Sequence, residues 1–223
     1  MQTQTFILWP GQSKSYLAES NLWNYIIDLW WEDFDELLNY IQKNNLEITW
    51  IIITHGHYDH ILWLNKFILS YEELSQKRHS AYNGELACIF DLRPLDSRGS
   101  QKSLNKCKVF ISAWDKDFLY DPGLNLSKFW WDGEFVLDKW IEVWILENGS
   151  KIWPFEVKFT PGHTRGSICL FDHENRNIFT GDTLFPNWEW RTDLSTGDDA
   201  LIVRSIFELS KYLKKWYKIF AGH

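Results

Sequence analysis

Residues 54–60 read THGHYDH, and this short stretch holds three histidines and one aspartate: His55, His57, Asp59 and His60. Imidazole nitrogens and carboxylate oxygens are the ligands that bind zinc and other transition metals in proteins. A polar helix cap is the ordinary alternative for the three histidines. The stretch therefore predicts a metal site.

Three more candidate ligands each follow a predicted strand: His163 in FTPGHTRGS, Asp182 in NIFTGD and His223 in KIFAGH. In α/β proteins the loops at the carboxyl ends of strands carry the chemistry. Seven ligands exceed the coordination of one zinc ion, so they predict two ions. We expect the first ion on His55, His57 and His163, the second on Asp59, His60 and His223, and Asp182 as a bridge.

Two such ions would suit hydrolysis. A water held between two dications ionises near neutral pH and can attack a carbonyl, while the second ion stabilises the oxyanion or the leaving group. We also give Asp59 a catalytic role. No side-chain nucleophile is needed, and we find no Ser-His-Asp set in the sequence.

The elements that must position these residues follow from patterning. Residues 47–54, EITWIIIT, predict a buried strand that leads into His55, and residues 59–67 begin the next helix. Further strands are predicted at 5–9, 15–20, 24–28, 108–114, 140–146, 151–160, 167–172, 176–182 and 217–223, and further helices at 32–45, 115–122 and 198–216. We interpret about residues 70–108 as an insertion or flexible excursion within a single domain, 1–223.

The amino-acid composition indicates which classes of binding partner to expect. The 223 residues are 45% hydrophobic, and the net charge is −7, which argues against a nucleic-acid backbone as partner. The three cysteines form no CxxC pair and suit a reducing cytoplasm. No signal peptide and no long apolar run are seen, so we expect a cytoplasmic protein with a small-molecule substrate and no membrane partner. The oligomeric state is open.

The motifs THGHYDH, TPGHTRGS, GDTLF and AGH, in this order, resemble those of the metallo-β-lactamase superfamily. The resemblance covers nearly the whole chain apart from about residues 70–108. It implies an α+β/α/β fold, a four-layer αββα sandwich with the metals at one edge between two sheets. GDTLF followed by RTDL looks most like the glyoxalase II-like (hydroxyacylglutathione hydrolase-like) thioesterases and the related persulfide dioxygenases.

The resemblance leaves three functions open. The first is a hydrolase with two Zn²⁺ ions, in which metal-bound hydroxide attacks a thioester or related acyl bond. The second is a persulfide dioxygenase with one Fe²⁺, held by His55 or its neighbours together with His163 and Asp182, because a 2-His-1-carboxylate set suits non-haem iron. A mixed Fe/Zn centre is a further alternative to two zinc ions. The third is an inactive metal-binding relative. The family's sequences usually continue past the ligand that matches His223 into a glutathione-binding helical domain, so we expect a substrate other than hydroxyacylglutathione and a possible truncation there.

Other polar residues have weaker signals. Asp28, which ends YIID, is either a partner that orients a ligand histidine or a turn acid. We expect Arg191 to support the pocket, Tyr58 to serve packing, and His79 and His173 to be ordinary histidines.

Tryptophan is unusually frequent, with 15 residues against 12 glycines. The family's glycine-rich turns are replaced here by tryptophan, and the clearest cases are Trp30, Trp31, Trp63, Trp188 and Trp190. Glycine serves such turns because it accepts positive φ without a steric cost. We predict that many of these positions are glycine in the natural protein, because UGA is read as tryptophan in some genetic codes and as glycine in others. The alternative is an unusually aromatic protein.

Overall fold

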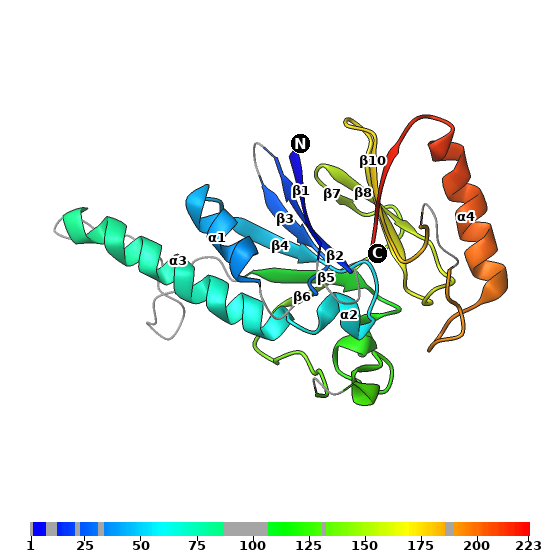
Figure 1. Ribbon diagram of the computed structural model, residues 1–223, viewed down its shortest axis with the longest axis horizontal. Helices are drawn as coiled ribbons and strands as arrows, with labels where there is room; N and C mark the ends of the chain where they lie inside the picture. Colours follow the sequence, from blue (N-terminus) through cyan, green and yellow to red (C-terminus); the bar gives the residue numbers. More distant parts are fainter. Residues whose placement is uncertain are drawn as a thin grey trace.

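Two β-sheets face each other in the computed structural model, with helices on the outer side of each sheet (Figure 1). The structure describes residues 2–7, 13–20, 23–30, 34–86, 107–130, 133–185 and 190–223, with the main chain alone for residues 76–86. The order of layers is helix, sheet, sheet, helix, as the predicted four-layer sandwich requires. The predicted fold class is therefore confirmed.

The first sheet has six strands in chain order. They are β1 (Gln2–Ile7), β2 (Lys14–Glu19), β3 (Asn24–Ile27), β4 (Ile48–Ile52), β5 (Lys108–Ser112) and β6 (Val143–Leu146). β1 to β3 pair antiparallel, whereas β3 to β6 run parallel. Parallel strands bring their carboxyl ends to one edge, so the loops after β3, β4 and β5 lie together.

The second sheet has the strand order β11-β10-β9-β8-β7. These strands are β7 (Lys151–Ile152), β8 (Phe155–Phe159), β9 (Ile168–Asp172), β10 (Asn177–Gly181) and β11 (Lys218–Ala221). β10 and β11 are parallel, and the other pairs are antiparallel. The predicted single strand at 151–160 is in fact the hairpin β7–β8, because Trp153 and Pro154 form a turn. Proline cannot donate to the ladder, which explains the break.

Alternation along the strands forms the core between the sheets. Tyr16 and Ala18 of β2 face the second sheet, and Ile168 and Leu170 of β9 face the first. Their neighbours point the other way: Leu17 packs under the helices on the first sheet, and Phe171 under the helix on the second. A strand with both sets of side chains buried has a helix layer on one face and a sheet on the other.

The helices are α1 (Asp35–Lys43), α2 (Tyr58–Ile61), α3 (Leu64–Leu86) and α4 (Asp199–Leu213), and two 3₁₀ helices are η1 (Lys116–Leu119) and η2 (Ser127–Phe129). α1 and α3 cover the first sheet and α4 covers the second (Figure 1). Asp198 caps α4 by accepting a hydrogen bond from the Leu201 amide at 2.9 Å. None of the helices within the described ranges is long and apolar enough to cross a membrane.

The stretch predicted as an insertion or excursion begins as helix. α3 continues to Leu86, and β5 starts at Lys108. The helix is anchored by Phe67, Ile68 and Tyr71, and its later part projects away from the sheets (Figure 1). The polar composition hid this helix, because a projecting helix lacks a continuous apolar face. Residues 87–106 lie outside the described residues, so the insertion stays a prediction.

The tryptophan positions give a mixed picture. Trp30 and Trp63 do not have positive φ. Trp31 and Trp188 lie outside the described residues, and so does residue 189, on which the φ angle of Trp190 depends. Trp216, just after α4, has φ +62° and is 86% exposed. That is a position where glycine would be unstrained.

Candidate metal centre

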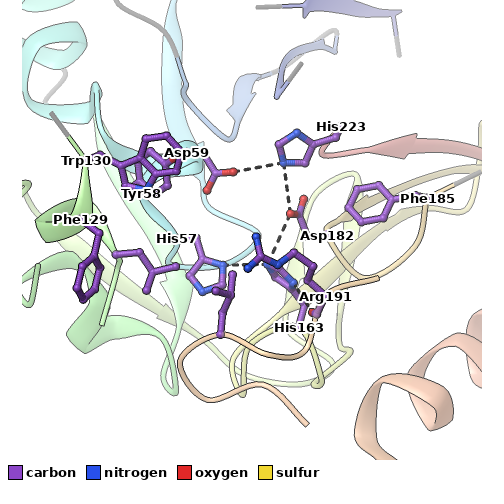
Figure 2. Close-up of a pocket in the computed structure, with 12 residues that line it drawn as sticks. His57, Tyr58, Asp59, Phe129, Trp130, His163, Asp182, Phe185, Arg191 and His223 are labelled. Carbon is purple, nitrogen blue, oxygen red and sulfur yellow. Dashed lines mark hydrogen bonds and ion pairs between the residues drawn. The ribbon is translucent and has the colours of Figure 1, made fainter. Parts of the chain in front are cut away.

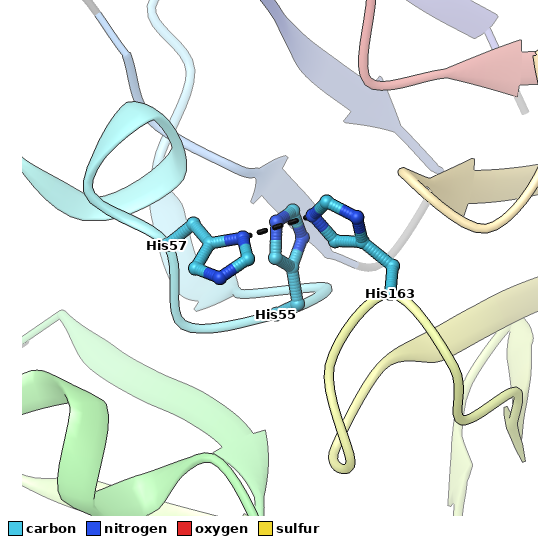
Figure 3. A group of neighbouring side chains, drawn as sticks. All are labelled: His55, His57 and His163. Carbon is cyan, nitrogen blue, oxygen red and sulfur yellow. Dashed lines mark hydrogen bonds between the residues drawn. The ribbon is translucent and has the colours of Figure 1, made fainter. Parts of the chain in front are cut away.

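His55, His57 and His163 converge from two loops (Figure 3). His55 and His57 follow β4 in the first sheet, and His163 follows β8 in the second. The three side chains are buried, with ligand atoms within 4.8 Å of one another. His57 Nδ1 lies 2.9 Å from His163 Nε2. The two sheets therefore bring together residues that are more than 100 positions apart in the chain.

Hydrogen bonding fixes the direction of the His163 ring. Its Nδ1 donates to the backbone carbonyl of Arg191 at 2.8 Å, which leaves an Nε2 lone pair directed at His57. His55 Nε2 is buried, and the described residues offer it no hydrogen-bond partner. Buried polar atoms are normally paired. The unpaired His55 Nε2, together with His57 Nδ1 and His163 Nε2, fits a cation bound among the three rings.

A second group lies beside the first and contains Asp59, His60, Asp182 and His223, again with ligand atoms within 4.8 Å of one another. Asp182 lies between the two groups. Its Oδ1 is 3.3 Å from His60 Nε2, and its Oδ2 is 3.4 Å from His223 Nε2 and 3.5 Å from His163 Nε2. The structure thus brings together all seven predicted ligands, in the predicted grouping, and the donor set fits two divalent ions.

Close backbone packing makes this arrangement possible. A Cβ atom on Gly222 would lie 2.1 Å from Asp182 Oδ1, so the residue before His223 must be glycine for the two loops to meet. The Gly222 amide donates to the Gly181 carbonyl at 2.9 Å, and the Gly222 carbonyl accepts from the Lys14 amide at 2.7 Å. β2, β10 and β11 are joined at this point, which sets the position of His223.

The two groups differ in their proton affinity. Burial, and then the charge of His60, lowers the pKa of His55 well below its usual value. Burial, and then His163, lowers the pKa of His57 to about 3. Both rings are therefore neutral at pH 7, the form that binds metals.

The second group is ionised instead. Burial alone would raise the pKa of Asp182, but His60 and His223 outweigh it and hold that pKa well below its usual value. Burial alone would lower the pKa of His223, but hydrogen bonds with Asp182 and Asp59 raise it to about 10. His60 also has a raised pKa, because Asp28, Asp182 and Asp59 outweigh its burial. In the metal-free protein at pH 7, His60 and His223 are thus protonated, and a second cation would replace these protons.

Asp28 lies against His60, where one of the two sequence interpretations expects an orienting partner. Its Oδ2 lies 2.9 Å from His60 Nδ1, so the opposite nitrogen is turned toward Asp182. The same carboxylate accepts hydrogen bonds from the amide and hydroxyl of Thr54, both at 2.7 Å. Asp28 itself has φ +55°, a strained conformation that aspartate tolerates better than most residues.

Asp115 is a residue that the sequence reasoning did not identify. It is fully buried after β5, and it accepts hydrogen bonds from the Gly56 amide at 2.9 Å, the Gly166 amide at 2.8 Å and the Thr164 hydroxyl at 2.6 Å. Gly56 lies between His55 and His57, and Thr164 follows His163. One carboxylate therefore ties the two histidine loops together. Its place directly after a strand is the signal that could have identified it.

A cavity of about 560 Å³ opens onto the two groups (Figure 2). Its lining consists of His57, Tyr58, Asp59, Leu126, Phe129, Trp130, His163, Asp182, Phe185, Arg191, Leu194 and His223. Figure 2 shows Tyr58, Phe129 and Trp130 on one side of the centre and Phe185 and Arg191 on the other. Tyr58 stacks on Trp130 with ring centroids 4.8 Å apart, in keeping with its predicted packing role.

The remaining predicted residues lie as follows. Arg191 lines the cavity, and its guanidinium pairs with Asp193. His173 is part of an exposed cluster with Glu156 and Tyr217, outside the cavity lining. The side chain of His79 is outside the described part of the structure.

Comparisons with known proteins agree with this geometry. Residues 8–73 and 133–223 match the family described as the Metallo-beta-lactamase superfamily. The chain is 27% identical over 217 residues to the "Probable metallo-hydrolase YqgX" of Bacillus subtilis, covering 96% of this chain and 86% of that protein. It is 26% identical over 194 residues to the "Hydroxyacylglutathione hydrolase GloC" of Haemophilus influenzae, covering 85% of this chain and 74% of that one.

A solved structure, described as TTHA1623 in a di-iron-bound form, superimposes with a TM-score of 0.74. The sequences are 23% identical, and the match covers 99% of this chain and 91% of the other. At this identity the match supports the fold, and the metal in that protein is a property of that protein.

Proposed function

The chain belongs to the metallo-beta-lactamase superfamily, and on that premise we propose that it is a metal-dependent hydrolase that uses a dinuclear centre, with zinc as the metal, to cleave a thioester. The observation that carries the proposal is the pair of ligand groups joined by Asp182, which opens on a cavity large enough for a small substrate. A bound divalent ion would supply Lewis acidity, lowering the pKa of a water and polarising an acyl carbonyl.

The chain's own residues would have four tasks, of which proton transfer is the last. The three histidines of the first group and the four residues of the second would hold the ions, and Asp28 and Asp115 would hold the ligand loops in place. The aromatic side chains around the cavity would keep bulk water from the reacting atoms.

Asp59 would carry the proton. Burial alone would raise the pKa of Asp59, but His60 and His223 outweigh it and lower that pKa, so the carboxylate is ionised at pH 7. Asp59 lines the cavity, so it can accept a proton from water. The water oxygen adds to the acyl carbon, the carbon–sulfur bond breaks with its electron pair on sulfur, and the proton passes from Asp59 to the thiolate. The products are a carboxylic acid and a thiol.

The likeness to a hydroxyacylglutathione hydrolase supports the thioester as the bond cleaved. Residues 191–194, RTDL, place Arg191 and Leu194 on the cavity wall, where they can contact a substrate. Two ligand groups also argue against a single-iron dioxygenase, which would leave Asp59, His60 and His223 without a role.

The test begins with metal content. The full chain, expressed with zinc and iron both supplied, should contain about two metal ions per chain, mostly zinc, and should hydrolyse simple thioesters. His223→Ala should lower the metal content and reduce hydrolysis by at least about 100-fold. The matched control His173→Ala, in the exposed cluster, should change neither. One iron per chain with oxygen uptake on persulfides would contradict the proposal.

A further inference from the structure

Much of the cavity lining is apolar. The apolar residues among the described lining are Leu126, Phe129, Trp130, Phe185 and Leu194. They share the cavity with residues of the candidate metal centre, so a substrate whose carbonyl lies at the centre would place its remaining atoms against some of them. Apolar contact of this kind favours groups that are poorly hydrated.

Leu126 stands out among them because of its backbone. It has φ +72° and ψ −1°, which is the left-handed region. A leucine is rarely found there, because its Cβ atom crowds the neighbouring carbonyl, and such strain collects at functional sites. Glycine or asparagine would adopt this conformation more readily, so the leucine side chain needs another explanation.

The neighbouring residues hold Leu126 in this conformation. Asn125 is fully buried, and its amide donates to the carbonyls of Phe118 and Phe135 at 2.7 and 3.2 Å. Its side-chain oxygen accepts from the Ser127 amide at 2.9 Å. Its backbone carbonyl accepts from the amide of Tyr58 at 2.8 Å, which fixes the loop directly to the helix that carries Asp59 and His60.

The charged residues that line the cavity also favour an uncharged substrate group. Among the described residues that line it, Arg191 is the one lysine or arginine. Its Nε and Nη2 donate to the two carboxylate oxygens of Asp193 at 2.9 and 3.0 Å. A negatively charged substrate tail would therefore have to compete with Asp193 for this guanidinium.

We propose that Leu126 is a specificity-determining residue, and that the substrates are thioesters with an uncharged, apolar acyl group that packs on Leu126 and Phe129. This inference rests on the proposed thioester hydrolysis. The loop between Asn125 and Ser127 keeps the leucine in its strained conformation, and the side chain is then held at a constant distance from the ligand groups.

The test uses acyl thioesters of N-acetylcysteamine, a small neutral thiol, with acetyl, butyryl, hexanoyl and succinyl groups. In the metal-loaded wild type, kcat/KM should rise from acetyl to hexanoyl by on the order of threefold per methylene. The charged succinyl ester should react more slowly than the butyryl ester. Leu126→Ala and Leu126→Gly should both flatten the dependence on chain length, whereas Leu124→Ala, a nearby leucine outside the cavity lining, should leave it unchanged.

A binding measurement separates this inference from the proposed function. Calorimetry with the unreactive S-hexyl and S-carboxypropyl thioethers of N-acetylcysteamine reports the pocket preference without any hydrolysis. Tighter binding of the hexyl analogue that is lost in Leu126→Gly supports the inference, even if no thioester is cleaved, in which case the proposed function alone fails. Two results would overturn the inference about Leu126. One is equal or tighter binding of the charged carboxypropyl analogue, and the other is an unchanged preference for the hexyl analogue in both Leu126 variants.

Discussion

Asp28 Oδ2 lies 2.9 Å from His60 Nδ1, and both residues are buried between the first sheet and the ligand loops. The carboxylate turns the opposite nitrogen of His60 toward Asp182. The same oxygen atoms accept two hydrogen bonds from Thr54, so Asp28 joins the end of β3 to the end of β4. In the metal-free protein the Nδ1 side of the His60 ring is thus in contact with Asp28. The contribution of this contact to metal binding can be tested.

Asp28→Asn should weaken metal binding by about 10- to 100-fold, because the amide cannot hold the His60 ring as the carboxylate does. Asparagine also tolerates positive φ, so the backbone is kept. Zinc affinity measured by competition with a chelator is the readout. Asp35→Asn, on the exposed side of α1, is the control. Unchanged affinity in Asp28→Asn would exclude an orienting role.

Asp115→Asn should destabilise the metal-free protein by about 1–3 kcal/mol, because an amide NH₂ would face hydrogen-bond donors where an oxygen now accepts. Urea denaturation measures the free energy of unfolding. Asp117→Asn, an exposed residue two positions later, should have little effect. Equal stability of both variants would contradict the view that Asp115 ties the two histidine loops together.

Metal binding should release protons at pH 7. His223 has its pKa raised to about 10 in the metal-free protein, so it is protonated at pH 7 and must lose that proton to bind a cation. Proton release should therefore decrease, and zinc affinity increase, as the pH rises toward 10. Calorimetry in buffers of different ionisation enthalpy measures the proton count. His223→Ala should release about one proton fewer at pH 7; the same count in both proteins would refute the assignment.

Trp216→Gly should stabilise the protein by about 1 kcal/mol, because glycine relieves the left-handed strain and the indole is 86% exposed. Thermal or urea unfolding measures the change. Trp144→Gly makes a useful contrast, since Trp144 lies in β6 and contacts Phe110 and Lys108; glycine there should destabilise. The coding DNA provides an independent check: a UGA codon at position 216 supports glycine as the natural residue, and UGG contradicts it.

The site could be predicted from the sequence to the extent that its chemistry is local. His55, His57, Asp59 and His60 stand together in the chain, and His163, Asp182 and His223 each end a readable strand. A strand end gives a residue a definite place at the edge of a sheet. That is why the sequence alone predicts that these seven side chains converge.

The rest depends on contacts between distant residues. Asp115 reaches Gly56 and Gly166, which are 59 and 51 positions away, and its place after a predicted strand does not by itself reveal these partners. Leu126 has no glycine or asparagine signal for its positive φ, because the conformation is imposed by Asn125 and Ser127. The end of α3 was hidden for a related reason, since the sequence of its later part shows no continuous apolar periodicity.

The ligands are divided between the two sheets: the loop after β4 and the helix α2 that follows it supply four of them, and the loops after β8, β10 and β11 supply the others. Metal ions bound there would cross-link the two sheets, because each ion centre has ligands from both. Their binding energy would then resist any sliding of the sheets, and the apolar layer between them would in turn keep the ligands in register. Catalytic geometry and the mechanical rigidity of the fold would thus depend on the same few bonds.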